Sequence, residues 1–222
     1  MKNTERFYNN VRWYLGNVGK IDSEYNEAMS RAKQYEGSAG GRALVDNATA
    51  TRDAALKAEK EATFKAIREI TASMRENTRA RKITPPTTEQ VNLLTVLKMR
   101  GDSLTADEIK QAANNMSDCP AALAVLSDIA RDRGLVVGLK GGNMTTDFIL
   151  KRIDSLEHSA LAMLRGDNAR FNRSPDDLGD CMTRFGSFNY AVDKDEWGRQ
   201  NAVVDQDAIT AFAAVVDGEG DN

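Results

Sequence analysis

Histidine, cysteine and proline are all scarce in this chain, and each scarcity argues against a class of protein. The 222 residues include one histidine, two cysteines and four prolines. A lone histidine cannot build a His-rich metal site, and no nucleophile pattern accompanies it, so we expect His158 to be a surface or interhelix residue. Cys119 and Cys181 lie far apart without a CxxC motif, which is typical of a reduced intracellular protein.

Long hydrophobic runs are also absent. No stretch approaches the ~20 consecutive apolar residues that a membrane-spanning helix needs. Polar side chains interrupt the apolar ones throughout the first residues, so we expect no secretory signal. These absences predict a cytoplasmic protein.

Helix-forming residues dominate what is present. Ala, Glu, Lys, Arg, Leu and Met, which lose little side-chain freedom in a helix, fill long stretches of the chain. Hydrophobic residues make up 41% and charged residues 28%, so the chain can bury a core. The sequence therefore predicts a mainly all-α fold, in one large domain or two small ones.

The charge is distributed unevenly along the chain. Residues 1–100 contain 18 Lys and Arg against 12 Asp and Glu, a net charge of +6. Residues 101–222 contain 12 against 21, a net charge of −9. A basic half and an acidic half favour attraction within the chain or head-to-tail, or separate partners for each half.

The strongest pattern is a heptad-like repeat in the first segment. Apolar positions alternate in steps of four and three residues over about four repeats, which is typical of a helix face that packs along another helix. We call this set the seam: Phe7, Val11, Tyr14, Val18, Ile21, Tyr25, Ala28, Ala32 and Tyr35. Because the seam is aromatic and small rather than leucine-rich, and Gly16 and Gly19 weaken the helix, it favours one face of a helical hairpin over a free-standing coiled coil.

A glycine-rich break at residues 36–41 separates this helix from a second one. The second helix is expected from about Arg42 to Arg79. Two helices of similar length with a short connection predict a long antiparallel hairpin over residues 1–83.

The pair Pro85-Pro86 marks the best boundary, because the residue before each proline is pushed out of the helical conformation. Thr88 is expected to cap the helix that follows. Three short helices are predicted, over residues 89–100, 105–116 and 120–133. The second begins with a capping box formed by Thr105 and Glu108. Residues 87–134 are therefore predicted to form a compact trihelical module.

The last segment, residues 144–222, is predicted to be an acidic helical and irregular region. Apolar residues recur at helical spacing over 146–164 and 205–216. The stretch between them, 165–197, is rich in Gly, Asp and Asn and is expected to be irregular but packed. Residues 135–143 are expected to form a loop or β-prone link.

Two acidic clusters have the composition of a metal or acid–base site, although solvated loops are the simpler interpretation. The clusters are Asp176, Asp177 and Asp180, and Asp193, Asp195 and Glu196. The sequence from Asp193 does not match a calcium-binding loop, because Trp197 and Val204 occupy positions where oxygen ligands are needed. The glycine-rich residues 138–142 lack the Lys-Ser/Thr of a phosphate loop. We therefore assign no catalytic, cofactor-binding or metal-ligating residue and expect a protein that is not an enzyme.

A basic cluster lies at the end of the second long helix. Its members are Arg68, Arg75, Arg79, Arg81 and Lys82. Such a cluster can bind phosphates, contact a carboxylate-rich protein surface, or simply be exposed to solvent. A helix-turn-helix role for the trihelical module is disfavoured, because residues 120–127 offer almost no donors to base edges.

Several stretches together resemble small helical proteins encoded by tailed bacteriophages and prophages. They are Glu5–Gly16, Thr87–Arg100, Leu104–Glu108 and Pro120–Gly134. The resemblance covers about 60% of the chain and includes no catalytic motif. It implies a virion-assembly or accessory protein, or a factor that acts on a host defence, located in the host cytoplasm or the virion. It transfers no functional residues.

The sequence thus predicts a non-enzymatic protein that binds other protein chains or itself, in a phage assembly or accessory context. One alternative is an inhibitor of a host nucleic-acid enzyme, such as an anti-CRISPR protein whose acidic half mimics phosphate. The other is a nucleic-acid-binding protein that uses the basic cluster. The predicted partner-binding residues are Phe7, Val11, Tyr14, Val18, Tyr25, Tyr35, Arg68, Arg75, Arg79, Arg81 and Lys82.

Overall fold

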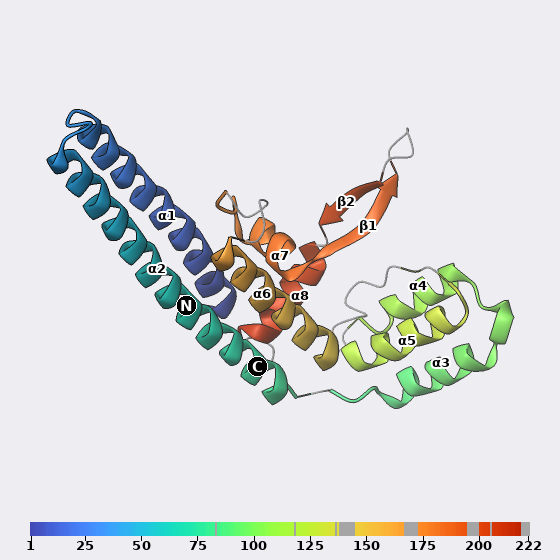
Figure 1. The fold of residues 1–222 in the computed structure, drawn as a ribbon. Coiled ribbons are helices and arrows are strands. Elements are labelled where there is room, and N and C mark those ends of the chain that lie inside the picture. The colour runs from blue at the N-terminus through green and yellow to red at the C-terminus, as the bar shows by residue number, and fades with distance from the viewer. Residues whose placement is uncertain are drawn as a thin grey trace. The chain divides into compact units, whose positions relative to one another are not determined.

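The computed structural model confirms a mainly all-α protein (Figure 1). It describes residues 1–82, 84–117, 119–135, 137, 145–166, 173–194, 200–204 and 206–218. The helices are α1 (Asn3–Lys33), α2 (Ala39–Ala80), α3 (Thr88–Met99), the short 3₁₀ helix η1 (Gly101–Ser103), α4 (Ala106–Asn114), α5 (Pro120–Asp132), α6 (Thr146–Arg165), α7 (Leu178–Gly186) and α8 (Gln206–Val216). A single two-stranded antiparallel hairpin, β1 (Asn189–Lys194) with β2 (Gln200–Val204), is described besides them.

The chain divides into two compact units, which we describe separately. Unit 1 comprises residues 1–72 and 157–181, and unit 2 comprises 73–156 and 182–222. The segments predicted from the sequence, 1–83, 87–134 and 144–222, do not coincide with these units. The last of them contributes to both, because α6 begins in unit 2 and ends in unit 1.

Unit 1 contains α1 and most of α2, which lie side by side and antiparallel (Figure 1). Asn17 Nδ2 donates to Glu59 Oε1 at 3.1 Å, and Arg52 Nε donates to Asp22 Oδ1 at 2.9 Å. In both pairs the two residue numbers add to about 75. A constant sum is expected for antiparallel helices, because each helix advances by the same distance per residue in opposite directions. The turn between the helices contains Gly37, whose positive φ of 81° suits glycine.

The second half of α6 and the start of α7 complete unit 1 and cover the open end of the helix pair, away from the turn. Thr71 Oγ1 in α2 donates to Glu157 Oε2 in α6 at 3.1 Å. Tyr8 in α1 donates to the backbone oxygen of Asp176 at 3.3 Å. The buried apolar residues here come from all these elements: Phe7, Val11, Tyr14, Ile67, Ile70, Ala160, Met163, Leu164 and Cys181.

Unit 2 includes a cluster of three helices, α3, α4 and α5, built around its own apolar core. This core includes Leu94, Leu97, Leu104, Ile109, Met116, Leu123, Leu126 and Ile129. The capping box predicted at the start of α4 is present, with Thr105 and Glu108 as partners. The cap of α3 lies one residue earlier than predicted. Its N-cap is Thr87 rather than Thr88, because Gln90 three residues on completes a capping box with Thr87.

The rest of unit 2 joins the end of α2 to α8. Asn77 Nδ2 donates to the backbone oxygen of Val216 at 2.8 Å. The rings of Phe188 and Phe212 meet edge-on with centroids 4.8 Å apart. The expectation of an irregular stretch over 165–197 was wrong in part, because α7 and β1 lie within it. Phe171, Trp197 and most of the 135–143 link lie outside the described residues.

Candidate interaction surface

Between Ala32 and Gly41, which are buried beside the turn, and the end covered by α6, the α1–α2 hairpin has no buried residue. Every residue from 15 to 31 in α1 and from 42 to 62 in α2 is exposed or only half-buried. We call these two segments the distal hairpin. Each of two paired helices covers only one side of the other. The described contacts of α6 lie beyond the distal hairpin, away from the turn, at Arg68 and Thr71 of α2. The distal hairpin therefore keeps one apolar face open.

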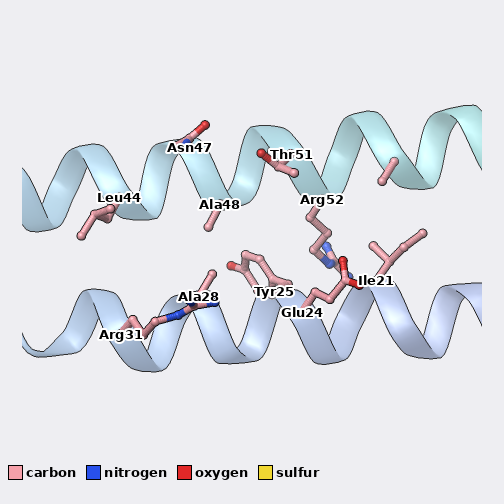
Figure 2. A pocket seen from close by; sticks show the side chains of 11 residues that line it. Ile21, Glu24, Tyr25, Ala28, Arg31, Leu44, Asn47, Ala48, Thr51 and Arg52 are labelled. Atoms are coloured by element: carbon pink, nitrogen blue, oxygen red, sulfur yellow. The ribbon is translucent and has the colours of Figure 1, made fainter.

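A groove runs along this face between the two helices (Figure 2). It encloses a volume of about 310 Å³. Its apolar lining comes from both helices and consists of Ile21, Tyr25, Ala28, Leu44, Ala48 and Ala55. Figure 2 shows Tyr25, Ala48 and Arg52 in the space between the two helices. Leu44 is 46% exposed, so part of the apolar lining of the groove is in contact with water.

One charged side chain of the groove is held within the hairpin. Arg52 pairs with Asp22, with Nη2 and Oδ1 2.8 Å apart, and its guanidinium lies 5.1 Å from the centre of the Tyr25 ring. The hydrogen bond with Asp22 raises the pKa of Arg52 further above its ordinary value. Arg52 therefore contacts both Asp22 and the Tyr25 ring at the groove.

Two other charged side chains of the groove have no such partner. Glu24 and Arg31 both line it and lie two helical turns apart on α1. Within the described part of the chain, neither side chain makes a hydrogen bond or an ion pair. The groove thus combines an apolar floor with one acidic and one basic side chain that have no partner within the described part of the chain.

The predicted partner-binding residues of α1 divide into two groups. Phe7, Val11 and Tyr14 are buried in unit 1 and cannot reach a partner in this fold, so they belong to the core. Burial, and then the negative charge of Glu59, raises the pKa of Tyr14. Val18 and Tyr25 are half-buried at the distal hairpin.

Sequence reasoning missed the α2 wall of the groove. Leu44, Ala48, Thr51 and Ala55 line it at steps of four, three and four residues. That spacing was readable in the sequence as a second heptad-like stripe. It was overlooked because three of its four residues are small or polar rather than large and apolar.

Two members of the basic cluster, Arg68 and Arg75, pair with carboxylates of the same chain. In unit 1, Arg68 lies 3.9 Å from a Glu157 oxygen, and its guanidinium is 4.3 Å from the centre of the Phe64 ring. In unit 2, Arg75 pairs with Asp154 at 2.8 Å. Arg81 and Lys82 also have interactions within the chain, while Arg79 is exposed. These contacts join the basic half of the sequence to the acidic half.

The first acidic cluster caps a helix. Asp177 Oδ1 accepts a hydrogen bond from the backbone N–H of Asp180 at 2.7 Å, and Asp180 Oδ2 accepts one from the N–H of Asp176 at 2.9 Å. These two bonds satisfy backbone N–H groups at and just before the start of α7. His158 is exposed on α6, as expected for a surface residue. Asp195, Glu196 and residues 138–142 lie outside the described residues.

Across the described residues, no group of three or more His, Cys, Asp or Glu side chains is arranged to hold a metal ion. None of the described helices combines the length and the apolar character needed to cross a bilayer.

Comparison with known proteins found no matching family model, no matching curated protein and no matching solved structure. The resemblance to phage-encoded helical proteins therefore stays a prediction.

Proposed function

We propose that this protein is a non-enzymatic interaction protein whose distal hairpin docks against another protein chain. The observation that carries the proposal is the absence of any buried residue over 15–31 and 42–62, although these segments carry an apolar face. Its context, following the resemblance of the sequence, is virion assembly or an accessory role in a phage.

The energetic reason is the apolar area left open in the groove. Burying apolar surface contributes roughly 25 cal/mol per Å², and Tyr25, Leu44 and Ile21 each keep part of theirs in contact with water. A helix or helix pair of a partner could lie along the groove and cover these side chains, because they recur every three or four residues, as the contact residues of packed helices do. The protein therefore gains stability when a partner is bound.

The other functions considered have less support. Nucleic-acid binding needs free cations, but Arg68 and Arg75 are paired with Glu157 and Asp154. A phosphate-mimicking inhibitor needs a row of carboxylates free to meet cations, whereas Asp177 and Asp180 of the first acidic cluster each use one oxygen to accept a hydrogen bond from the backbone at the start of α7. The distal hairpin, in contrast, can bind a protein without breaking any of these ion pairs or hydrogen bonds.

A photo-crosslinking amino acid placed at Leu44 tests the proposal. Irradiation of the protein in the cells that produce it should give a crosslinked product from this site, because Leu44 lies in the groove and is partly exposed. Ala50 is the matched control, since it is exposed on the same helix but does not line the groove. The proposal fails if Leu44 gives no more crosslinked protein than Ala50.

A further inference from the structure

We infer that the groove of the distal hairpin is covered by the same groove of a second copy, with the two hairpins packed antiparallel about a two-fold axis near Ala28. This inference rests on the proposed function and names the partner. The result would be a four-helix bundle formed by two distal hairpins, with α1 facing α1 and α2 facing α2.

The extent of the uncovered face fits this arrangement. Ala28 lies within the apolar part of α1 that runs from Val18 to Ala32. The pairs Asn17–Glu59 and Asp22–Arg52 place Ala28 level with about residue 47 of α2. Small side chains, Ala28 and Ala48, line the groove at this level. Helices approach closely where side chains are small, so this is a suitable crossing point.

The two unpaired charges of the groove are self-complementary under the same axis. Glu24 precedes Ala28 by four residues, and Arg31 follows it by three. An antiparallel two-fold pairing therefore places Glu24 of each copy opposite Arg31 of the other, which forms two equivalent ion pairs. A parallel pairing would not bring these two side chains together, because they are about 10.5 Å apart along the helix.

The area of the face sets the expected strength. With the axis near Ala28, the overlap covers residues 23–33 of α1 and 39–55 of α2, which is roughly 15–25 Å of helix with each helix about 10 Å wide. A footprint of roughly 400 Å² on each copy is below the standard size and in the range of weak interfaces. We therefore expect a reversible dimer whose population depends on protein concentration.

Charge reversal provides the decisive experiment. Glu24→Arg alone gives a copy with two cations at the interface, and Arg31→Glu alone gives a copy with two anions. Each variant should dimerise about tenfold more weakly than the wild type, because each substitution converts two attractive pairs into two repulsive ones. An equimolar mixture of the two variants should regain wild-type dimerisation, because every pair across that mixed interface is again attractive.

Sedimentation velocity of each variant and of the mixture, over a concentration series, gives the readout. Glu27→Arg is the matched control, since Glu27 is exposed on α1 and does not line this groove. The inference is overturned if the wild type is monomeric throughout the series, if the single reversals dimerise like the wild type, or if the mixture stays monomeric.

The crosslinking experiment separates this inference from the proposed function. A product from Leu44 at twice the monomer mass that contains only this chain supports both. A product that contains a different chain, together with a monomeric wild type, keeps the proposed function and overturns the second-copy partner. No product from Leu44 above the Ala50 control overturns both.

Discussion

Phe7 and Ile21 occupy the same position of the heptad pattern, two repeats apart in α1, yet Phe7 is fully buried and Ile21 is only half-buried. The difference comes from what covers each residue, not from the residue type. Phe7 lies at the end of the hairpin where Glu157 of α6 and residues near Asp176 contact the helices. At the scale of a single residue, the seam predicts which side of the helix is apolar but not whether that side is covered.

Local hydrogen bonds, in contrast, follow from residues close in sequence, and one of them predicts a pH dependence. Glu108 accepts hydrogen bonds from the Thr105 N–H at 3.0 Å and from its hydroxyl at 2.9 Å, and it pairs with Arg100. These partners hold the pKa of Glu108 below its ordinary value of 4.5. Because the folded-state pKa is lowered, the stabilisation is complete above about pH 4.5 and is lost as the pH falls through the folded-state pKa.

We expect Glu108→Gln to lower the thermal midpoint at neutral pH and to have a progressively smaller effect as the pH falls below about 4.5. The glutamine keeps an oxygen that can accept the cap hydrogen bonds, so the variant removes the charge alone. Thermal unfolding of both proteins over a pH series measures the difference. A difference that stays constant across that series would show that the charge has no role.

At the scale of elements, the turn between α1 and α2 depends on close backbone contact. A Cβ atom at Gly41 would lie 2.2 Å from the backbone oxygen of Tyr35, whereas a Cβ at Gly40 would lie no closer than 3.8 Å to the Ser38 hydroxyl. Backbone atoms cannot move aside as a side chain can, so only glycine fits at position 41. The glycine-rich break expected from the sequence therefore has one residue with a steric requirement.

We expect Gly41→Ala to loosen the turn, with amide exchange over residues 33–45 rising about tenfold or more, as for a local destabilisation of about 1–3 kcal/mol. Gly40→Ala is the matched control and should leave exchange unchanged or slow it, since alanine favours the helix by about 1 kcal/mol over glycine. Hydrogen exchange read by mass spectrometry distinguishes the two variants. Equal exchange in both would contradict the steric argument.

At the scale of the whole molecule, the opposite charges of the two sequence halves are partly neutralised by pairing. Arg68 contacts Glu157 in unit 1, and Arg75 contacts Asp154 in unit 2. Each pair joins a residue of the basic half to one of the acidic half. Such pairs reduce the positive potential along the end of α2 and with it the attraction for phosphates.

We therefore expect duplex DNA at moderate salt to leave the solution mass of the protein unchanged. Light scattering of the protein alone and with added DNA measures this. Double replacement of Asp154 and Glu157 by Asn and Gln frees the two arginines and serves as a positive comparison, which should bind DNA in a salt-dependent way. A salt-sensitive complex of the wild type with DNA would make the basic cluster a nucleic-acid site after all.

The sequence by itself determined the features that depend on neighbouring residues. Helical propensity and apolar spacing predicted α1, α2, α6 and α8 within a few residues, and the Thr105–Glu108 cap was read directly. Helix α7 and the β-hairpin were missed. Helix α7 is only nine residues long, and the hairpin was not distinguished from an irregular stretch.

Only the tertiary structure decided which part of the apolar seam is core and which part remains open. Glu157 reaches Thr71 across 86 positions of sequence, so no local pattern records that this end of the hairpin is covered. The same holds for Leu44 and Tyr25, which come together in the groove only because α2 folds back along α1. Burial is a property of contacts between distant segments, whereas helix formation depends largely on the residues within one or two turns.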